Sequence, residues 1–412
     1  MPPRFLVPRA RRAWGRLRRR LQGIERRVVS LAPLAAAREP VGRVLLSYVI
    51  DPFLVDDESK ISYAHTKDWE CFAMARTWCE LGFAVDVIHW TNAEFLPAGP
   101  YDVLIDVRRN LERLAPAVGA GCLKIFHAET AHWRTNDEAQ LARLDQLAAR
   151  RGRRLGRLRL VGENHGIEVA DCAVVLGNEW TMESFRPFGK RLYRVPLSNA
   201  FEYPSPEGKA IAAARGRFVW FGGVGFVHKG LDLAIEAIAG VPGLHLEIAA
   251  PLDREPPFAA LYERELFATN NVRVLGWLDV GAPSFLDFAN RNLALLFPSC
   301  SEGGGGSAVT AMHAGLIPVA TAATSVDFDD SEGVTLDDVG VDAIRARCLE
   351  LASRPFAALE AMAVAAWVRA RATHTRERFR AEYRAAAIRM LERFRPRLLA
   401  RAVVEASRGA AS

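Results

Sequence analysis

Short apolar runs alternate with stretches of helical spacing along most of this chain. After Pro40 the apolar runs predict strands, and the periodic stretches between them predict helices. In the first half the expected strands span 43–50, 84–89, 102–106, 123–127 and 172–176, and the expected helices span 69–81 and 137–150. Short strands that alternate with helices are typical of a parallel sheet covered on both faces. Residues 41–200 are therefore predicted to form an α/β domain.

A second series of the same kind begins after a polar stretch at 201–216, which we expect to be a linker. Its strands are predicted at 218–221, 244–250, 272–275, 293–297 and 316–319, within a domain that spans 217–374. An amphipathic pattern then predicts a long helix within 375–400, and residues 401–412 are expected to be a tail. A chain of 412 residues fits two domains better than one.

Apolar residues at helical spacing also run through a basic N-terminal arm, residues 1–40. Eleven arginines and two glutamates give the arm a net charge of +9, against +6 for the whole chain. A helix with one apolar stripe and a basic remainder suits the surface of an anionic membrane. The alternatives are a helix docked on its own protein, a short coiled coil and a signal peptide. The stripe consists of Trp14, Leu17, Leu21, Ile24, Val28 and Leu31.

Composition narrows the class of protein. No apolar run of about 18 residues is free of charge, so no membrane-spanning helix is expected. The six cysteines are scattered and include no CxxC pair, which favours a reducing, cytoplasmic compartment over a disulfide framework or a zinc site. Because the excess basic charge belongs to the arm, a fold that binds nucleic acid is not expected.

The most informative segment joins the predicted strands 293–297 and 316–319. It holds one acid, Glu302, and a helix start near Ser307, with four glycines between them: Gly303, Gly304, Gly305 and Gly306. Glycines let backbone N–H groups approach a ligand, and a helix start adds unpaired donors at the positive end of a dipole. This combination suits a diphosphate. A carboxylate beside it is better placed to bind a polyol, so the segment predicts a nucleotide sugar as ligand.

A second glycine-bearing loop, FGGVGFVHKG at 221–230, also follows a strand and precedes a helix. It matches neither the dinucleotide fingerprint nor the P-loop. Lys229 stands at the helix start, where its charge opposes the dipole unless an anion neutralises it. We therefore expect Lys229, with Gly223 and Gly225, to bind the diphosphate; the alternative is an exposed lysine at a turn.

A third loop adds Trp277, which is expected to stack on the nucleobase or to close the core as a rim aromatic. The carboxyl ends of parallel strands share one edge of a sheet, so the three loops are predicted to meet in one crevice.

Three further features carry candidate chemistry. His127 ends a predicted strand, which suits a catalytic or substrate contact as well as a structural histidine. Asp327-Phe-Asp329 has the D-x-D form of a metal site, but we expect a solvated turn there and no metal. Arg150, Arg151, Arg153 and Arg154 form a basic cluster, either a solvated face or a contact to an anionic membrane or a pyrophosphate-bearing acceptor lipid.

The second half resembles the C-terminal half of a GT-B glycosyltransferase of the family 4, or group 1, type. The stretches that carry the resemblance are FVWFGGVGFVHKGLDLAIEAI, NVRVLGWLDV and FPSCSEGGGGSAVTAMHAGLIPVAT. They are most similar to bacterial members that assemble surface polysaccharides, as is RRG-x-x-L-x-x-x-R in the first half. The resemblance implies two Rossmann-like domains that face a cleft, and a final helix that crosses back to the first domain. It also implies retention at the anomeric carbon, with no metal and no cofactor besides the donor.

The family pattern assigns the diphosphate to Lys229 and the donor sugar to Glu302. Two positions depart from it: Thr310 stands where a second acid usually holds the ribose, and Val224 where an arginine usually precedes the lysine. The predicted function is thus a glycosyltransferase that moves a sugar from a nucleotide diphosphate to a glycan or lipid-linked acceptor. A degenerate nucleotide-sugar-binding or scaffold protein and a nucleotide-sugar epimerase are the alternatives.

Overall fold

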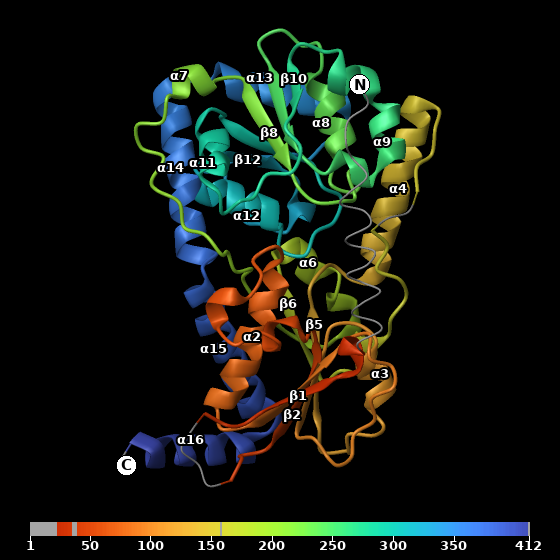
Figure 1. Ribbon diagram of the computed structural model, residues 1–412, viewed down its shortest axis with the longest axis vertical. Helices are drawn as coiled ribbons and strands as arrows, with labels where there is room; N and C mark the ends of the chain where they lie inside the picture. Colours follow the sequence, from red (N-terminus) through yellow and green to blue (C-terminus); the bar gives the residue numbers. More distant parts are fainter. Residues whose placement is uncertain (1–22, 35–38, 157–158, 411–412) are drawn as a thin grey trace.

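The computed structural model describes residues 23–34, 39–156 and 159–410, with side chains through residue 404 in the last helix. Two α/β domains lie one above the other in Figure 1, each built on its own sheet. This confirms the predicted fold class.

The N-terminal domain has a seven-stranded sheet in the order β1-β3-β2-β4-β5-β6-β7. Neighbouring strands are parallel except for β1, which pairs antiparallel with β3. The strands are β1 (Val28–Leu31), β2 (Arg43–Tyr48), β3 (Ala84–His89), β4 (Val103–Asp106), β5 (Leu123–Ala128), β6 (Cys172–Leu176) and β7 (Arg191–Val195).

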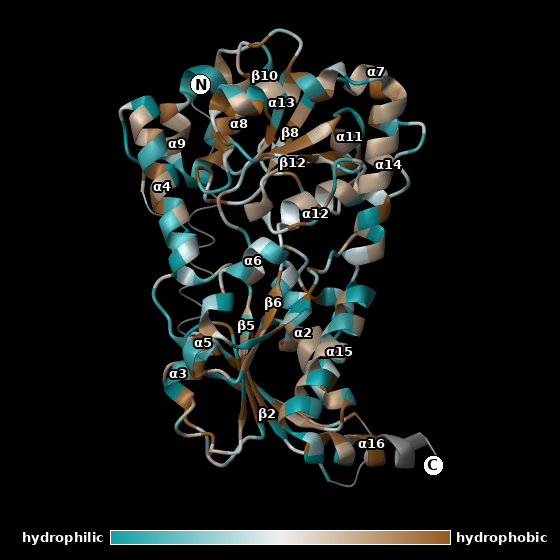
Figure 2. Ribbon diagram, turned by 180° about the vertical axis from the view of Figure 1, so that it is seen from behind, coloured by the Kyte–Doolittle hydropathy of each residue, from teal (hydrophilic) through white to brown (hydrophobic). Residues whose placement is uncertain are grey.

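Helices cover both faces of this sheet, and consecutive residues of β2 point to opposite faces. Val44 and Leu46 belong to the core under α2 and α15, whereas Leu45 belongs to a second core under α3 and α5. Figure 2 shows the same layering, with apolar strands inside and polar outer faces on the helices. The helices are α2 (Thr66–Glu80), α3 (Asn110–Leu114), α4 (Trp133–Arg151), α5 (Gly166–Val169), α6 (Glu179–Glu183), α15 (Arg376–Phe394) and α16 (Pro396–Ala410).

The C-terminal domain has a six-stranded, all-parallel sheet in the order β10-β9-β8-β11-β12-β13. Its strands are β8 (Arg217–Phe221), β9 (His245–Ala249), β10 (Val272–Val274), β11 (Ala294–Phe297), β12 (Ile317–Ala320) and β13 (Val334–Thr335). Its helices are α7 (Ile211–Ala214), α8 (Leu231–Ile238), α9 (Pro256–Leu261), α10 (Glu263–Phe267), α11 (Pro283–Asn290), α12 (Gly306–His313), α13 (Val341–Ser353) and α14 (Phe356–Thr373).

Both domains also contain short 3-10 helices. They include η1 (Ile24–Arg26), η2 (Asp51–Phe53), η3 (Glu58–Lys60) and η4 (Arg186–Phe188) in the N-terminal domain, and η5 (Leu252–Arg254) and η6 (Ala322–Thr324) in the C-terminal domain.

Two helical segments connect the domains along their sides (Figure 1). After α14, which packs on α12, the chain returns to the N-terminal domain, where α15 packs on α2 and β7. The indole N–H of Trp78 on α2 donates to the hydroxyl of Tyr383 on α15 at 3.2 Å. On the opposite side α4 extends from the N-terminal domain past the edge of the C-terminal one. The two domains are therefore held from both flanks.

The helix predicted through the N-terminal arm is wrong over its described part. Ile24 lies in η1, and Val28 and Leu31 lie in β1, which pairs residue by residue with β3. The reason is tertiary: β3 would otherwise be the open edge of the sheet, and the β-branched pair Val28-Val29 suits a strand that covers it. Trp14, Leu17 and Leu21 lie outside the described residues.

Within the part of the chain that the structure describes, no single helix is long and apolar enough to cross a membrane. Only α13 and α14 taken together pass that test of length and composition, and they form a pair bent by 110°.

Candidate functional site

The loops that follow β8 and β11 meet at the edge of the C-terminal sheet that faces the other domain. They hold the two predicted site residues, Lys229 and Glu302, whose side chains form an ion pair. Both are largely buried, with 9% and 8% of their surfaces exposed. The structure thus brings together two charged residues that lie far apart in the sequence.

The Glu302 carboxylate is fixed by a second donor, the hydroxyl of Ser299 at 3.1 Å. Its backbone is fixed as well, because its N–H donates to Ala323 and its carbonyl accepts from Ser325. Burial raises the pKa of Glu302, but the charges of Lys229, His228 and Arg159 and the hydrogen bond from Lys229 together outweigh burial and lower the pKa to about 2. Burial lowers the pKa of Lys229, and Glu302 opposes that shift. The carboxylate is therefore charged at any physiological pH.

The glycine loop turns sharply into α12. Gly304 and Gly305 have φ of +99° and +58°, which L side chains rarely adopt, and Gly305 is the N-cap residue of α12. The first N–H groups of this helix, those of Gly306 and Ser307, have no intrahelical acceptor. A Cβ on Gly222 would lie 3.6 Å from both the Ser307 hydroxyl and Lys229 Cδ, so donors from the two loops border one small space.

The loop at 221–230 is open at Gly223, where a Cβ would meet no atom within 4 Å. At Gly225 the prediction needs a correction. Its N–H donates to the carboxylate of Glu255, which also accepts from the N–H of Phe226 at 3.2 Å. In the described structure these amides bind an internal carboxylate, so Gly225 does not offer its N–H to a diphosphate. Sequence reasoning missed Glu255, which precedes α9 and carried no local signal.

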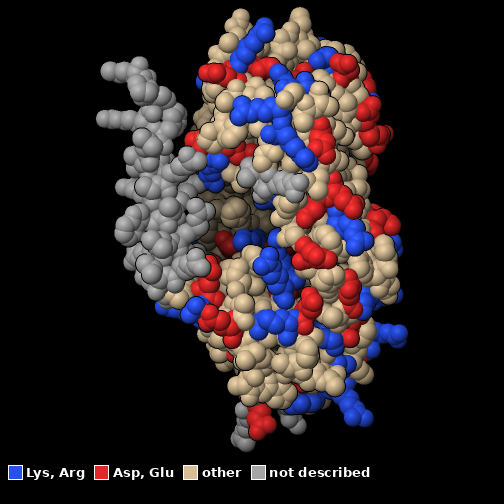
Figure 3. All heavy atoms as spheres, turned by 90° about the vertical axis from the view of Figure 1, so that its right-hand side faces the viewer, with Lys and Arg blue, Asp and Glu red and all other residues tan. Residues whose placement is uncertain are grey.

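The N-terminal domain contacts the site loop at Gly303. A Cβ on Gly303 would overlap the carbonyl oxygen of Glu129 and lie 3.0 Å from Cα of Thr130, so the two domains touch here through backbone. The Glu129 carboxylate pairs with Arg108, whose Nε donates at 2.9 Å. On the α4 side the surface is hollowed between the domains, with basic and acidic side chains around the hollow (Figure 3).

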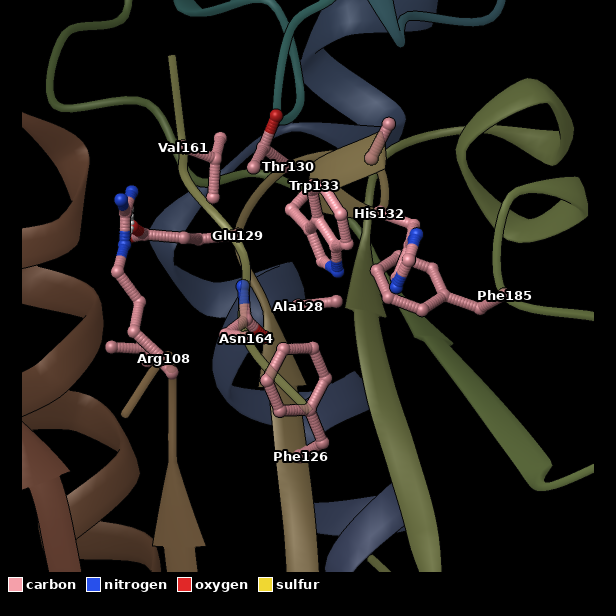
Figure 4. A pocket seen from close by; sticks show the side chains of 12 residues that line it. Arg108, Phe126, Ala128, Glu129, Thr130, His132, Trp133, Val161, Asn164 and Phe185 are labelled. Carbon is pink, nitrogen blue, oxygen red and sulfur yellow. Dashed lines mark hydrogen bonds and ion pairs between the residues drawn. The ribbon is translucent and has the colours of Figure 1, made fainter. Parts of the chain in front are cut away.

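A small pocket lies beside this contact, in the N-terminal domain, and Glu129 and Thr130 are among the residues that line it. Arg108 and Glu129 stand side by side at one end of it, and His132 packs on the ring of Phe185 at the other (Figure 4). Trp133, the first residue of α4, lies between them. The pocket joins a charged pair to an aromatic wall.

His127 does not reach the site. The residue is fully buried in the described structure, and its ring packs on those of Tyr48 and Tyr383. Burial lowers the pKa of His127 to about 4, so the ring is neutral. Neither ring nitrogen has a hydrogen-bond partner among the described residues, so a hydrogen-bonded structural histidine is not seen either. The catalytic contact stays a prediction that would need a change of conformation. The sequence could not show that Tyr383 returns from α15 to cover this strand end.

Two donor-side predictions have different outcomes. The Thr310 hydroxyl is nearly buried and donates to the side-chain oxygen of Asn199 at 3.1 Å, so it lies at the domain junction. Trp277 follows β10 at the edge of the sheet and is 57% exposed, which excludes the core alternative. Its stacking on a nucleobase stays a prediction.

The basic cluster is divided by the structure. Arg150 and Arg151 are half-buried. They form ion pairs across the domain junction with Asp232 and Glu236 of α8, and Arg151 also pairs with Glu265. The predicted membrane or acceptor contact is wrong for these two residues in this conformation. Arg154 pairs with Asp145 at 2.9 Å on the exposed face, and Arg153 is exposed.

The D-x-D acids pair with arginines. Asp327 bonds to Arg194, and Asp329 lies 3.7 Å from Arg369. Among the residues that the structure describes, no group of three or more His, Cys, Asp or Glu side chains is arranged to hold a metal ion.

Comparison with known proteins agrees with this geometry. Residues 215–354 match the family model of Glycosyl transferases group 1. This region holds Lys229, Glu302 and the four glycines at 303–306, so the predicted resemblance is confirmed for the C-terminal domain. No curated protein matches the chain in sequence.

Two solved structures share the fold across both domains. Sucrose-phosphate synthase from Thermosynechococcus elongatus is similar with a TM-score of 0.57 and 14% identity, over 86% of this chain and 100% of that one. HepE from Anabaena in complex with UDP-glucose is similar with a TM-score of 0.53 and 12% identity, over 84% of this chain and 99% of that one. The likeness confirms the GT-B architecture.

Proposed function

We propose that this protein is a retaining, metal-independent glycosyltransferase that moves a sugar from a nucleotide diphosphate to a glycan or lipid-linked acceptor. We further propose a role in bacterial cell-surface polysaccharide biosynthesis. The observation that carries the proposal is the buried Lys229–Glu302 pair, set between two glycine loops at the junction of the domains. The match of residues 215–354 to a glycosyltransferase family model supports it.

The arrangement suits stabilisation of a leaving diphosphate. Lys229 has three N–H donors, of which Glu302 takes one, so two remain for phosphate oxygens. The start of α12 borders the same space at Ser307, and its N–H groups without an intrahelical acceptor add the positive end of the helix dipole. Negative charge grows on the diphosphate as the bond to the sugar breaks. Donors fixed around that position lower the barrier because they need no reorganisation.

Glu302 would orient the sugar. Its carboxylate stays ionised and accepts hydrogen bonds, which suits sugar hydroxyl groups better than phosphate. The acceptor would enter from the N-terminal domain, where a small pocket is lined by Glu129 and Thr130, the two residues that Gly303 approaches. Contact between the domains would then exclude water from the reacting bond and limit hydrolysis.

The test is a panel of nucleotide sugars and nucleoside diphosphates, scored by thermal shift and then by turnover with candidate acceptors. A ligand that binds only the folded state raises the apparent melting temperature by mass action. Lys229→Ala should lower kcat/KM by about 100-fold, equivalent to about 2.7 kcal/mol of transition-state stabilisation. Turnover like that of the wild type in this variant would remove the assigned role of Lys229.

One observation favours a second candidate, a degenerate nucleotide-sugar-binding protein. Thr310 stands where the family pattern has an acid, and its hydroxyl donates a hydrogen bond to Asn199. A protein that binds a nucleotide sugar tightly, yet turns over none of the donors with any acceptor, would be such a scaffold.

For localisation we propose a cytoplasmic protein that touches the inner membrane surface through its basic arm. Because β1 belongs to the sheet, a test deletion should stop at residue 22. Removal of residues 1–22 should abolish flotation with anionic liposomes and leave donor binding intact. Equal flotation of both forms would reject the membrane role.

A further inference from the structure

We propose that Arg159 of the N-terminal domain supplies a second cation to the diphosphate site. This inference deepens the proposed function and rests on it. Arg159 belongs to the basic segment at residues 143–159 and has no role in the transfer mechanism given above. We assign it a direct contact with the nucleotide diphosphate.

The charge balance of the two loops shows why another cation is needed. Lys229 is neutralised by Glu302, and Glu255 adds one more negative charge at the amide of Gly225. Ion pair and carboxylate together carry a net charge of −1, which repels a diphosphate. The other residues of the 221–230 loop offer only His228, whose pKa burial lowers to about 4. The missing positive charge must come from outside the C-terminal loops.

Arg159 lies directly over the first of these loops. A Cβ on Gly225 would lie 2.8 Å from Cδ of Arg159 and closer still to its Cγ. Glycine at this position therefore makes room for the arginine, and its φ of +93° independently favours glycine. The arginine stem packs on the loop, while the residue remains exposed enough to receive a ligand.

The position of Arg159 is fixed by the start of α4. The side-chain amide of Asn136 donates to the carbonyl of Arg159 at 3.0 Å. Next to it the Asp137 carboxylate accepts from the N–H groups of Val161 at 2.7 Å and Gly162 at 3.0 Å. Three hydrogen bonds thus hold the backbone at Arg159 and in the residues that follow it, which limits the entropy lost on binding.

The charge of Arg159 acts on both loops. Burial lowers the pKa values of His228 and Lys229, and the charge of Arg159 lowers both further. Burial raises the pKa of Glu302, and the charge of Arg159 is one of the influences that lower it. No carboxylate among the described residues forms a salt bridge with Arg159, so no described acid competes with a phosphate for its guanidinium. A planar guanidinium matches a phosphate with two parallel hydrogen bonds, which suits it to this ligand.

A consequence follows for domain closure. Lys229 and the start of α12 belong to the C-terminal domain, whereas Arg159 belongs to the N-terminal one. A diphosphate held by both sets would bridge the domains and favour their contact. After transfer, dissociation of the nucleoside diphosphate would remove that bridge. The domains could then separate and release the glycosylated acceptor.

The experiment measures binding of UDP, GDP, ADP and inorganic pyrophosphate, and of the matching nucleoside, by isothermal titration calorimetry. Arg159→Ala should weaken the preferred diphosphate by about 10- to 100-fold, as expected for a lost hydrogen-bonded charge. Nucleoside binding should not change, and Arg159→Lys should restore part of the affinity. The matched control is Arg191→Ala, which removes an exposed arginine at the opposite end of a parallel strand, the start of β7.

The outcomes separate the two proposals. If the wild type binds a diphosphate and Arg159→Ala binds it as tightly as Arg191→Ala does, the role of Arg159 is overturned and the proposed function stands. Should the wild type bind none of the probes at millimolar concentration, both are overturned. Equal loss of nucleoside and diphosphate binding would show a distorted loop and would also reject a charge contact. Thermal unfolding of each variant confirms that it is folded.

Discussion

Replacing Glu302 with glutamine should tighten the binding of UDP, or of whichever nucleoside diphosphate the protein prefers, while it impairs sugar transfer. The carboxylate is bonded to the Lys229 ammonium, so a diphosphate must share that cation with Glu302. Glutamine has nearly the same shape, and its oxygen can still accept from the Ser299 hydroxyl and from Lys229. The substitution therefore removes one negative charge beside the diphosphate and little else.

The size of the effect follows from Coulomb's law. Two unit charges about 5 Å apart interact by about 3 kcal/mol at an effective dielectric constant of about 20. Solvent in the cleft screens roughly half of this, so UDP should gain about 1.5 kcal/mol, or about tenfold in affinity. A nucleotide sugar gains the same binding free energy from the removed charge. Its sugar hydroxyl groups lose their hydrogen bonds to the charged carboxylate of Glu302, which are worth about 1.5 to 3 kcal/mol. The variant should thus bind UDP-glucose no better than the wild type and turn it over about 100-fold more slowly.

Calorimetry with UDP and UDP-glucose tests this on three proteins: the wild type, Glu302→Gln and the control Glu332→Gln. Glu332 is also 8% exposed and also pairs with a cation, Arg369, at 2.9 Å, so the control reproduces the loss of a buried ion pair outside the site. The control should leave both affinities unchanged. If Glu302→Gln weakens UDP, or matches the control, the carboxylate does not compete for Lys229 and the site is elsewhere.

The same variant has a signature in acid. Burial raises the pKa of Glu302, but Lys229 and the neighbouring His228 and Arg159 together lower it to about 2 from an ordinary value of 4.5. A group with a lowered pKa in the folded state stabilises the fold fully above its unfolded pKa. That contribution is lost as the pH falls from about 4.5 towards 2. The free energy of unfolding should therefore fall less steeply in this window for Glu302→Gln than for the wild type, as measured by urea denaturation at each pH.

Two further predictions concern the contact between the domains. Gly303→Ala should lower kcat by about 100-fold, because its Cβ would overlap a carbonyl of the other domain. The melting temperature should change little, because the backbone φ of Gly303 is one that alanine adopts. Unchanged rates in steady-state kinetics would show that turnover does not need this contact. Arg150→Ala should lower the free energy of unfolding by about 1 to 3 kcal/mol, because it leaves Asp232 buried without its partner; Arg154→Ala, which loses an exposed pair, should have little effect in the same denaturation series.

The features that the sequence predicted correctly are those written locally in the chain. Apolar runs such as 84–89 and 172–176 coincide with β3 and β6, because a buried parallel strand needs a continuous apolar run. Lys229 and Glu302 were found for a similar reason. Each follows a predicted strand and stands beside glycines, and parallel strands bring such loops to one edge.

The features that the sequence missed depend on partners distant along the chain. β1 forms because β3 has an open edge, which no property of residues 28–31 announces. Glu255 takes the amides of Gly225 and Phe226 from thirty and twenty-nine residues away. His127 looked like a cleft residue because it ends a strand, yet Tyr383 of a returning helix covers it. In each case the deciding contact is tertiary, and a single sequence does not display it.

The basic segment after residue 143 shows how one charge run divides among several tasks. Arg143 donates to the carbonyl of Pro298 at 3.0 Å, just before the site loop, while Arg150 and Arg151 pair with acids of α8. These arginines belong to one domain and all their partners belong to the other, so opening the cleft must return several charges to water. Salt screens charges and lowers the cost of that step, hence rising ionic strength should favour the open form. A diphosphate gripped by Arg159 would act in the opposite direction, since it adds one more charge-assisted contact that exists only when the domains meet.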